Sequence, residues 1–481
     1  MSILSVPFLF FLIALMGLYY LLPAKWAPYV LLAGNLYFYL QFDWRYAIFL
    51  SLSILCTFFG GWWIQGSQGR GRKAALATVL ILNIGCLFTV KFAPWLCGIA
   101  DRAFHTELSD LTASILVPLG ISFYTLQLCG YCIDIYRQKY PAATNFFKYA
   151  SFSTFFPLML QGPISRYDQL GEQLFQKAPK KEFYQNLTSG AQLMLWGFFK
   201  KLVLADRAAI AVNLVFQTPE EYSGITVAVA ALCYTLQIYA DFSGCVDICR
   251  GAARIFGIHV IKNFQQPYFA TSIQDFWRRW HIALSSWLRD YVYFPLGGNR
   301  KGTLRKYVNL FIVFMVSGLW HGVGFNFLVW GALQAVFQIA GALLLPLREK
   351  CCALLHIDRK STPYIWFRRL FTLGLVTFSW IFFRANGTMA ALGMLRSLFT
   401  TSHADFFPGL DLLDVGILAA GTLLLFFVSC YQEKGRSPRE TVAKWPLPIR
   451  WPLYLALFLM VLIFGVYGPG YSASSFIYMN F

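Results

Sequence analysis

Long apolar runs separated by short polar segments make up most of the chain. A helix that crosses a membrane needs about 20 predominantly apolar residues. By this criterion the pattern predicts an all-α polytopic membrane protein with roughly eleven to thirteen membrane segments. These segments begin near Ile3, Trp26, Tyr46, Ala75, Thr112, Phe147, Ser189, Gly224, Tyr307, Phe325, Trp366, Leu412 and Trp451.

Two of these segments are interrupted. The segment after Phe147 contains two prolines, and the segment after Ser189 contains the adjacent lysines Lys200 and Lys201. Irregular backbone and charge at membrane depth are tolerated only where protein or a water-filled cavity satisfies them. We therefore expect these two segments to be short, tilted or re-entrant.

The composition agrees with a membrane protein. Hydrophobic residues make up 58% of the chain and charged residues only 13%, whereas a soluble domain is about a quarter charged. We therefore predict a single domain over residues 1–481, embedded in a lipid bilayer. The formal net charge of +18 comes without a basic tail or a nucleic-acid-binding motif, so we expect no nucleic-acid partner.

The distribution of charge predicts which loops are cytoplasmic, because cytoplasmic loops retain Lys and Arg. Residues 65–73 and 433–450 are rich in Lys and Arg and are predicted to be cytoplasmic. Residues 101–110, 218–222 and 401–411 are acidic or nearly free of Lys and Arg, so we expect them outside. No internal repeat is visible, which disfavours a transporter built from duplicated halves.

The eleven cysteines do not form the closely spaced array of a disulfide scaffold or a zinc site. Cys129 and Cys132 form a CxxC pair, but they lie inside an apolar segment without a second pair at zinc-binding spacing. We predict no metal site.

Residues 238–322 differ from the rest of the chain and form its candidate catalytic region. Polar, charged and aromatic residues are mixed here in IYADFSG (238–244), in residues 263–300 and in SGLWHG (317–322). This is the least lipid-like part of the sequence, and chemistry is expected here.

An amphipathic helix over residues 273–291 is predicted within this region. Its apolar residues Trp277, Trp280, Leu284 and Trp287 recur every three or four residues, with arginines elsewhere on the circumference. The helix is therefore expected to lie along a membrane interface. A purely structural helix on the cytoplasmic side of the membrane would also carry these arginines. It does not explain His281 beside Trp280.

A second histidine lies in the longest charge-free stretch. Residues 307–347 contain no Lys, Arg, Asp or Glu and predict two spans, with His321 in the interior. His321 lies roughly 21 Å of helix beyond Tyr307, and nearby glycines permit a bend or close helix contact. An ionisable residue at this depth is a candidate functional residue, although a neutral histidine bonded to a neighbouring helix is an equally good interpretation.

Imidazole chemistry suggests what His321 does if it is functional. Burial favours the neutral ring, which can take a proton from a hydroxyl group as a general base. The chain has no GxSxG elbow, HExxH motif or Walker loop. Direct transfer from an activated thioester to an alcohol is therefore the simplest mechanism.

These residues resemble the signature of the membrane-bound O-acyltransferase family. The resemblance spans nearly the whole chain, with Gln161 as one departure where a small residue is expected, and the combined motifs are very specific. The blocks that carry it are VPLGISFYTLQ (117–127), DIYR (134–137), FFPLMLQGPISR (155–166), YADFSG (239–244), NFQQPY (263–268), FWRRWHIALSSWLRDYVYFPLGGNR (276–300), LWHG (319–322) and the final SSFIYMNF (474–481).

The resemblance implies a bundle of about eleven spanning helices, with re-entrant and interfacial pieces, around a central tunnel. By resemblance, His321 is the catalytic histidine and His281 is the second signature histidine. The branch that looks closest is the alginate O-acetyltransferase type. It moves acetyl groups from a cytoplasmic thioester donor, acetyl-CoA or another acyl thioester, toward hydroxyls of an exported or cell-wall polysaccharide.

The same resemblance implies no tightly bound cofactor and a location in the inner membrane of a bacterial cell. The implied partners are the polysaccharide acceptor and an extracytoplasmic, SGNH-like acetyltransferase that completes delivery. Further residues are predicted to bind the donor or line the tunnel, although positive-inside bias explains the arginines equally well. They are Trp320, Trp280, Arg278, Arg279, Asn299, Arg300 and Asp241.

Three alternatives stay open at this point. D-alanyl transfer to teichoic acid is the closest rival, because the transferase for that reaction resembles this one. A transporter or flippase is the alternative from another class, but it predicts charges scattered through several spans. A scaffold without catalytic activity is disfavoured by the two histidines.

Overall fold

The computed structural model describes residues 1–112, 114–399 and 405–467. In these residues the chain forms helices and no strands, which confirms the prediction of an all-α protein. The final SSFIYMNF block and the first residues of the predicted outward loop 401–411 lie outside this described part.

The chain divides into two compact units. The first unit comprises Met1–Met194 and Cys245–Ile261, and the second comprises Leu195–Gly244 and Lys262–Phe481. The helices α10 (Phe183–Phe198) and α12 (Gly224–Ile255) each contribute residues to both units.

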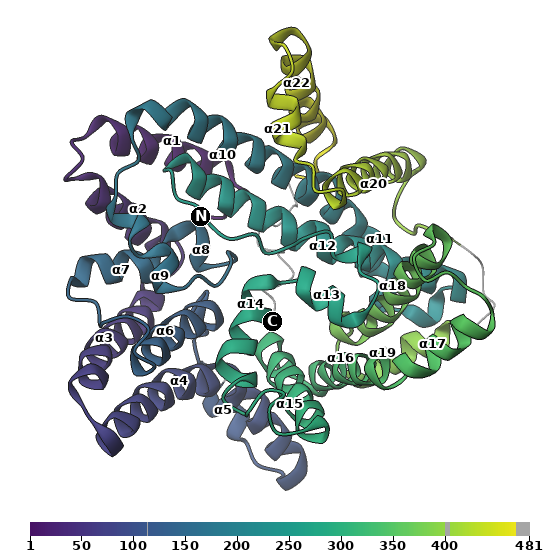
Figure 1. Ribbon diagram of the computed structural model, residues 1–481, viewed down its shortest axis with the longest axis horizontal. Helices are drawn as coiled ribbons and strands as arrows, with labels where there is room; N and C mark the ends of the chain where they lie inside the picture. The colour runs from purple at the N-terminus through teal and green to yellow at the C-terminus, as the bar shows by residue number, and fades with distance from the viewer. Residues whose placement is uncertain (113, 400–404, 468–481) are drawn as a thin grey trace. The chain divides into compact units, whose positions relative to one another are not determined.

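The first unit is built from short and long helices (Figure 1). Besides parts of α10 and α12, its elements are α1 (Val6–Leu21), α2 (Ala27–Leu40), α3 (Trp44–Gly66), α4 (Gly69–Phe104), α5 (Leu108–Thr112), α6 (Ile121–Tyr136), α7 (Phe146–Thr154), α8 (Phe156–Met159), α9 (Tyr167–Leu170) and the 3₁₀ turns η1 (Gln173–Phe175) and η2 (Lys180–Glu182).

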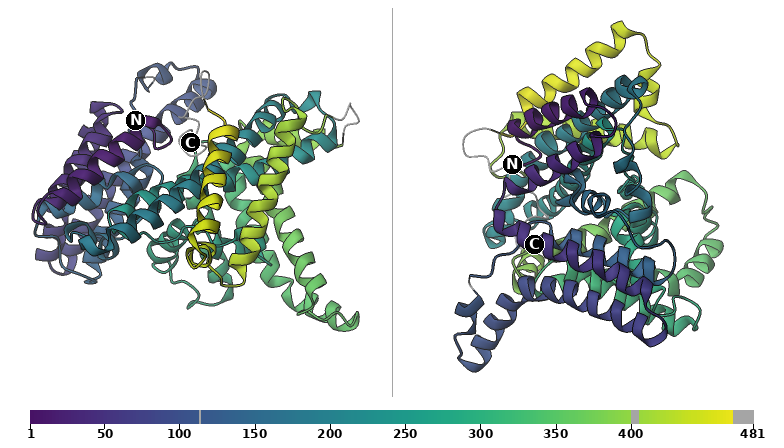
Figure 2. Two further views of the ribbon diagram at one scale, coloured as in Figure 1. Left: turned by 90° about the horizontal axis from the view of Figure 1, so that it is seen from above. Right: turned by 90° about the vertical axis from the view of Figure 1, so that its left-hand side faces the viewer.

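Close helix contact organises the first unit. The helices α3 and α4 form a hairpin (Figures 1 and 2). A Cβ on Gly60 of α3 would lie only 2.5 Å from Val79 of α4, so glycine permits this approach. Two of the sequence blocks also meet here, because a Cβ on Gly120 would lie 2.6 Å from the Met159 carbonyl oxygen.

The second unit contains the candidate catalytic region except for residues 245–261. Besides its parts of α10 and α12, its elements are the π-helical η3 (Phe199–Ala205), α11 (Asp206–Gln217), η4 (Pro219–Glu221), η5 (Pro267–Phe269), α13 (Ile273–Arg279), α14 (Ile282–Leu288), the π-helical η6 (Arg289–Tyr293), α15 (Thr303–His321), α16 (Phe325–Leu343), α17 (Leu345–Leu354), α18 (Thr362–Arg384), α19 (Thr388–Ser397), α20 (Leu412–Glu433), α21 (Pro438–Ala443) and α22 (Leu447–Phe464).

The π-helical segment η3 lies in an apolar core of the second unit. Its side chains pack with Ala240 of α12, Leu418 and Leu425 of α20 and Val461 of α22. The backbone N–H of Val466 also donates to the Leu202 carbonyl at 2.9 Å. The two lysines that interrupt the segment after Ser189 belong to η3 and are buried.

The charge-free stretch contains most of α15 and all of α16, and α16 is long and apolar enough to cross a membrane. The helices α15 and α16 form a hairpin whose turn contains Gly322 and Gly324. A Cβ on Gly318 would lie 2.5 Å from the Phe327 carbonyl oxygen, and one on Gly331 would lie 2.5 Å from the Phe314 carbonyl oxygen. Glycine therefore lets the two helix backbones approach closely.

Within the described residues, seven helices are long and apolar enough to cross a membrane: α3, α4, α12, α16, α18, α20 and α22. They correspond to seven of the thirteen predicted segments. The other six form shorter, broken or more polar helices. For example, α1 has 16 residues and α2 has 14, and the segment after Phe147 breaks into α7 and α8 at Phe155.

Candidate functional site

The predicted helix over residues 273–291 is wrong, because the structure breaks it at His281. The helix α13 ends at Arg279, α14 begins at Ile282, and a π-helical turn follows from Arg289. His281 has φ 45° and ψ 53°, a left-handed conformation that is uncommon for any residue but glycine. Such backbone persists only where the surrounding structure holds it.

Asn263, in the NFQQPY block, holds this break. Its carbonyl accepts from the Ile282 N–H at 3.0 Å, and its side-chain oxygen accepts from the Ala283 N–H at 3.0 Å. The same Oδ1 lies 3.3 Å from Nδ1 of His281. Because a side-chain carbonyl oxygen only accepts, Nδ1 carries the proton and Nε2 of the neutral ring carries the lone pair.

His321 is the last residue of α15, where the chain turns toward α16. Only 3% of its surface is exposed, and none of the surface of His281 is. The centres of the two imidazole rings lie 6.3 Å apart. The fold therefore brings together two histidines that belong to separate sequence blocks.

Aromatic rings surround the pair. The ring of Phe242 lies 4.8 Å from that of His281, and the rings of Trp330 and Phe383 lie 5.1 and 5.3 Å from that of His321. Trp320 contacts both histidines, at 4.8 Å from His321 and 5.9 Å from His281. The structure thus places this predicted residue at the site.

Burial in this shell controls the protonation of His281. It lowers the pKa of the imidazole to about 3, because an apolar surrounding disfavours the charged ring. The ring is neutral at physiological pH. A neutral imidazole with a fixed proton on Nδ1 presents an acceptor on Nε2.

Trp280 packs in the aromatic core next to His281, and its predicted role in donor binding or tunnel lining stays a prediction. Its side chain is fully buried, with ring-centre distances of 5.0 Å to Phe264, 5.4 Å to Phe276 and 5.3 Å to Trp380. The ring forms part of the core that supports the break at His281.

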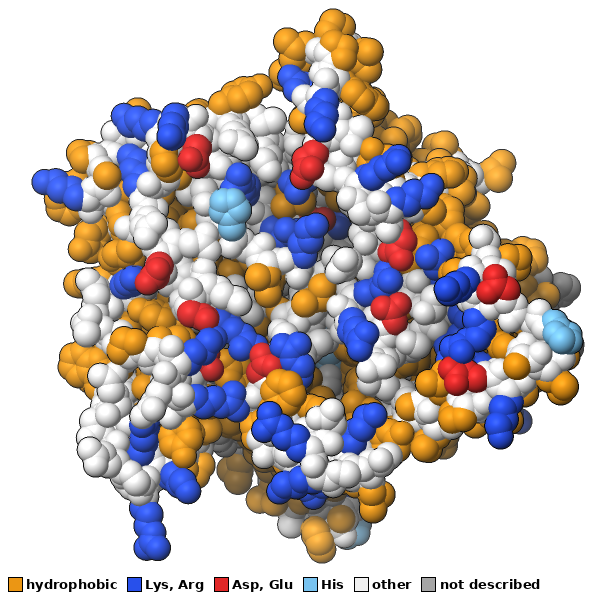
Figure 3. Space-filling view, in the orientation of Figure 1, with side chains coloured by type: hydrophobic (Ala, Val, Ile, Leu, Met, Phe, Trp, Pro, Cys, Tyr) orange, Lys and Arg blue, Asp and Glu red, His pale blue; other side chains and the backbone are white. Residues whose placement is uncertain are grey.

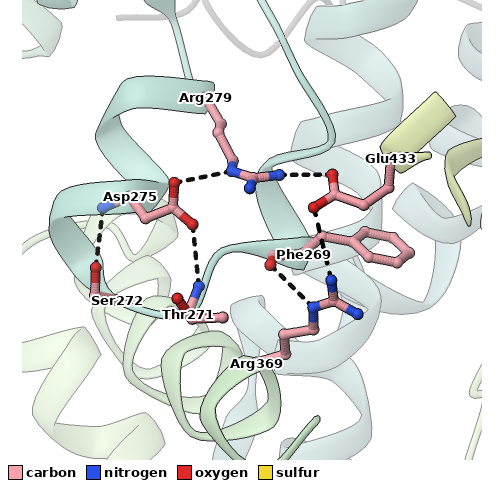
Figure 4. A network of polar contacts seen from close by, with 7 residues as sticks. All are labelled: Phe269, Thr271, Ser272, Asp275, Arg279, Arg369 and Glu433. Carbon is pink, nitrogen blue, oxygen red and sulfur yellow. Dashed lines mark hydrogen bonds and ion pairs between the residues drawn. The ribbon is translucent and has the colours of Figure 1, made fainter. Parts of the chain in front are cut away.

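Arg279 is neutralised by acidic partners (Figure 4). Its Nε lies 3.0 Å from an oxygen of Asp275, and its Nη1 lies 2.7 Å from an oxygen of Glu433 at the end of α20. Arg369 approaches the other Glu433 oxygen at 3.6 Å. This network anchors α13 and leaves Arg279 poorly suited to bind an additional anion.

Three further donor-binding candidates lie on the surface. Arg278, Asn299 and Arg300 are exposed, whereas both histidines are buried. The loop that carries Asn299 and Arg300 is held by the buried Asn309, whose side chain donates to the Leu296 and Gly298 carbonyls. A role for these three residues in donor binding stays a prediction.

Asp241 belongs to a buried ion cluster. Its carboxylate lies 3.0 Å from Nζ of Lys201, which also lies 2.7 Å from Asp206. The neighbouring Lys200 donates to the hydroxyl of Ser243 at 2.9 Å. Because Phe242 packs on His281, the cluster fixes the stretch of α12 that contacts the site.

Lys201, Asp206 and Asn263 were not among the predicted site residues. The two adjacent lysines in an otherwise apolar segment were the available signal for the cluster. The role of Asn263 had no such signal, because it depends on contacts with a helix start that the sequence pattern did not predict.

The arrangement suits proton transfer in a dry environment. Two imidazoles lie close together, one with a defined acceptor nitrogen, and aromatic side chains exclude water around them. Electrostatic and proton-transfer effects are stronger where water is excluded.

The family model described as "MBOAT, membrane-bound O-acyltransferase family" matches residues 142–384. This range contains both histidines and most of the residues discussed above.

Curated relatives match over greater lengths. The "Probable alginate O-acetylase AlgI" of Pseudomonas putida is 32% identical over 98% of this chain and 99% of its own length. The "Peptidoglycan O-acetyltransferase" of Helicobacter pylori is 32% identical over 79% of this chain and 74% of its own. The "Teichoic acid D-alanyltransferase" of Bacillus subtilis is 27% identical over 54% of this chain and 66% of its own.

Proposed function

Because the chain belongs to the membrane-bound O-acyltransferase family and is a multi-pass membrane acyltransferase, we propose that it moves acetyl groups from a thioester donor toward hydroxyls of a polysaccharide. The donor is a thioester on the cytoplasmic side, acetyl-CoA or another acyl thioester. The polysaccharide is an exported or cell-wall polymer.

The observation that carries this proposal is the pairing of His281 and His321. Their ring centres lie 6.3 Å apart in a buried aromatic shell. His321 takes the proton from the acceptor hydroxyl, and the oxygen attacks the thioester carbonyl carbon. The carbon–sulfur bond breaks, and the departing thiolate takes the proton back from His321, so that an ester and a thiol result.

His281 stays neutral through this cycle and positions the donor. Its acceptor nitrogen is fixed by the hydrogen bond from Nδ1 to Asn263, and burial lowers the pKa of the ring to about 3, so the ring binds a proton weakly. The two histidines therefore have different roles.

The names of the relatives support acetyl transfer to a polysaccharide. Alginate and peptidoglycan are both carbohydrate polymers, and these relatives match over more of the chain than the D-alanyltransferase does. We place the protein in the inner membrane, with a separate extracytoplasmic acetyltransferase that completes delivery. A tunnel that leads to the histidines from both faces is part of this proposal.

The test uses membranes that contain the protein and labelled acetyl-CoA, with alginate or peptidoglycan as acceptor. His321→Ala should lower label transfer at least about a hundredfold, the lower end of what general-base catalysis supplies. His259→Ala, which removes an exposed imidazole from the first unit, should change it less than about twofold.

Two results would overturn the proposal. One is a His321→Ala variant that keeps more than about a tenth of the activity, well above the expected range. The other is transfer from a D-alanyl thioester but not from an acetyl thioester, which would favour D-alanyl transfer to a wall polymer.

A further inference from the structure

A cavity of about 800 Å³ lies in the second unit, away from the histidine pair. It is formed by α17, the loop that follows, the start of α18 and the two residues before α13. Its charged lining is mainly basic: Arg348, Arg359, Lys360 and Arg368 against Glu349 and Asp358. Figure 3 shows Lys and Arg side chains, interspersed with acidic ones, over the region where Figure 1 places α17.

The basic side chains of the cavity differ in the hydrogen bonds and ion pairs that they already form. Arg368 donates from Nε and Nη2 to the Thr271 carbonyl, at 3.1 and 2.7 Å. Arg359 pairs with Glu349 at 2.8 Å, and both side chains are nearly half exposed. An exposed pair of this kind contributes little to stability, so Arg359 can exchange its partner for a ligand.

Arg348 shows an unmet need for an acceptor. Its Nε is buried and has no hydrogen-bond partner among the described residues. A buried polar group without a partner destabilises the folded protein. A ligand oxygen in the cavity would supply the missing acceptor.

The uncharged part of the lining combines the polar side chains of Thr271, Ser272 and Tyr364 with apolar ones. Cys352, Ala353, Ile357 and Ile365 form walls beside the arginines. Such a cavity suits a phosphate group attached to an organic moiety, because Arg binds phosphate oxygens in a charge-assisted and often bidentate manner.

We propose that this cavity binds a phosphate ester, and that the ester belongs to the coenzyme A moiety of the acyl donor. The assignment of the donor rests on the proposed function, whereas the assignment of a phosphate does not. The headgroup of an anionic phospholipid offers the same chemistry, and exposed leucines on α17, such as Leu347 and Leu354, would lie close to such a lipid.

The position of the cavity favours the acyl donor over a phospholipid as the ligand. Thr271 and Ser272 line it and directly precede α13. This helix of seven residues is about 10 Å long, and His281 follows two residues after its end. A donor whose phosphates lie in the cavity could therefore extend its thioester arm along α13 toward the histidines.

Charge in the surrounding segment agrees with a cytoplasmic donor. Between α16 and α18 the chain carries Arg348, Lys350, Arg359 and Lys360 against two acidic residues, a bias typical of cytoplasmic loops. Of the arginines that the sequence offers for the donor phosphates, Arg279 already pairs with Asp275 and Glu433, whereas Arg278 and Arg300 are exposed.

The experiment measures binding of coenzyme A to the purified protein by calorimetry in nanodiscs of phosphatidylcholine. Arg348→Gln should weaken binding at least about tenfold, since it removes a charge-assisted contact. Lys350→Gln is the matched control, because it removes one charge from the same helix at an exposed position outside the cavity. It should change binding less than about twofold.

A second arm identifies the source of the phosphate. Binding of phosphatidylglycerol to the same proteins is measured in detergent. If Arg348→Gln weakens only the binding of coenzyme A, the site belongs to the donor. If it weakens only the binding of phosphatidylglycerol, the cavity is a phosphate site but its assignment to the donor is wrong. If Arg348→Gln and Lys350→Gln behave alike in both arms, the phosphate site is wrong.

Folding of the variants is monitored by size-exclusion chromatography. If Arg348→Gln is not recovered as a single species, Arg348→Lys replaces it, because lysine keeps the charge but lacks the Nε donor. This variant should bind coenzyme A more weakly than the parent. Intact coenzyme A binding without acetyl transfer in any assay would contradict the proposed function and leave the phosphate site standing.

Discussion

At residue 281, burial acts on both the backbone and the imidazole ring. The left-handed backbone is held by two hydrogen bonds to Asn263, and full burial lowers the pKa of the ring to about 3. The ordinary value for histidine is 6.5. Between these two values the unfolded chain binds one more proton than the folded chain.

This difference predicts a dependence of stability on pH. The contribution of the neutral His281 ring to the free energy of unfolding is complete above about pH 6.5. It is lost as the pH falls toward 3, because protonation then favours the unfolded chain. His281→Gln should therefore lose less thermal stability than the parent between pH 7.5 and pH 5. Unfolding temperatures of the detergent-purified proteins provide the measurement, and equal losses in both would contradict the buried neutral ring.

At the scale of elements, the α15–α16 hairpin determines where His321 lies. The helices approach through Gly318 and Gly331, so a side chain at either position would meet backbone of the opposite helix. Helix packing of this kind depends on small residues, because only they allow close approach of the backbones.

Gly318→Ala should destabilise the protein by about 1–3 kcal/mol, the usual cost of overpacking. It should also lower acyl transfer, because His321 lies one turn farther along α15. Gly341→Ala in α16 is the control, since a Cβ there meets nothing within 4 Å. Thermal unfolding and label transfer are measured together, and similar behaviour of the two variants would contradict the close helix contact.

At the scale of the whole molecule, charge is distributed between buried clusters and loops. The cluster of Lys201, Asp206 and Asp241 is almost fully buried in the second unit. Removal of one partner from a buried ion pair costs about 3–5 kcal/mol, because the remaining charge is left without compensation.

Lys201→Met should therefore lower the unfolding temperature strongly. Lys434→Met, at an exposed position of the same unit, should leave it nearly unchanged. Adding Asp206→Asn and Asp241→Asn to Lys201→Met should restore part of the loss, because the uncompensated negative charges are then removed. If the triple variant is no more stable than Lys201→Met alone, the cluster is held by packing and not by charge.

Loop charge also predicts the orientation in the membrane, and Cys351 reports on it. Among the eleven cysteines, all within the described residues, this one is exposed. A membrane-impermeant maleimide should label Cys351 in inverted vesicles but not in intact spheroplasts. Glu107→Cys in a Cys351→Ser background should show the reverse pattern. Labelling of Cys351 from outside would place the phosphate cavity on the wrong face for a cytoplasmic donor.

The local pattern of apolar runs and motifs was sufficient to predict the fold class and the family of this protein. In a bilayer a long apolar run forms a helix, because only a helix satisfies the backbone polar groups of a single run. The all-α fold and the two helices of the charge-free stretch were therefore predictable from the sequence. The motif residues around His281 and His321 identified the family. These features depend on residues that are near one another in the chain.

Tertiary structure decided the features that depend on distant contacts. Residues 273–291 have the periodicity of a helix, but the hydrogen bonds that Asn263 accepts from Ile282 and Ala283 hold a break in that helix at His281. Arg279 lies in an arginine-rich stretch that predicts anion binding, yet Glu433, 154 positions away, forms an ion pair with it. Both outcomes follow from burial and charge compensation between elements, and periodicity and loop charge carry no information about which distant residue becomes a neighbour.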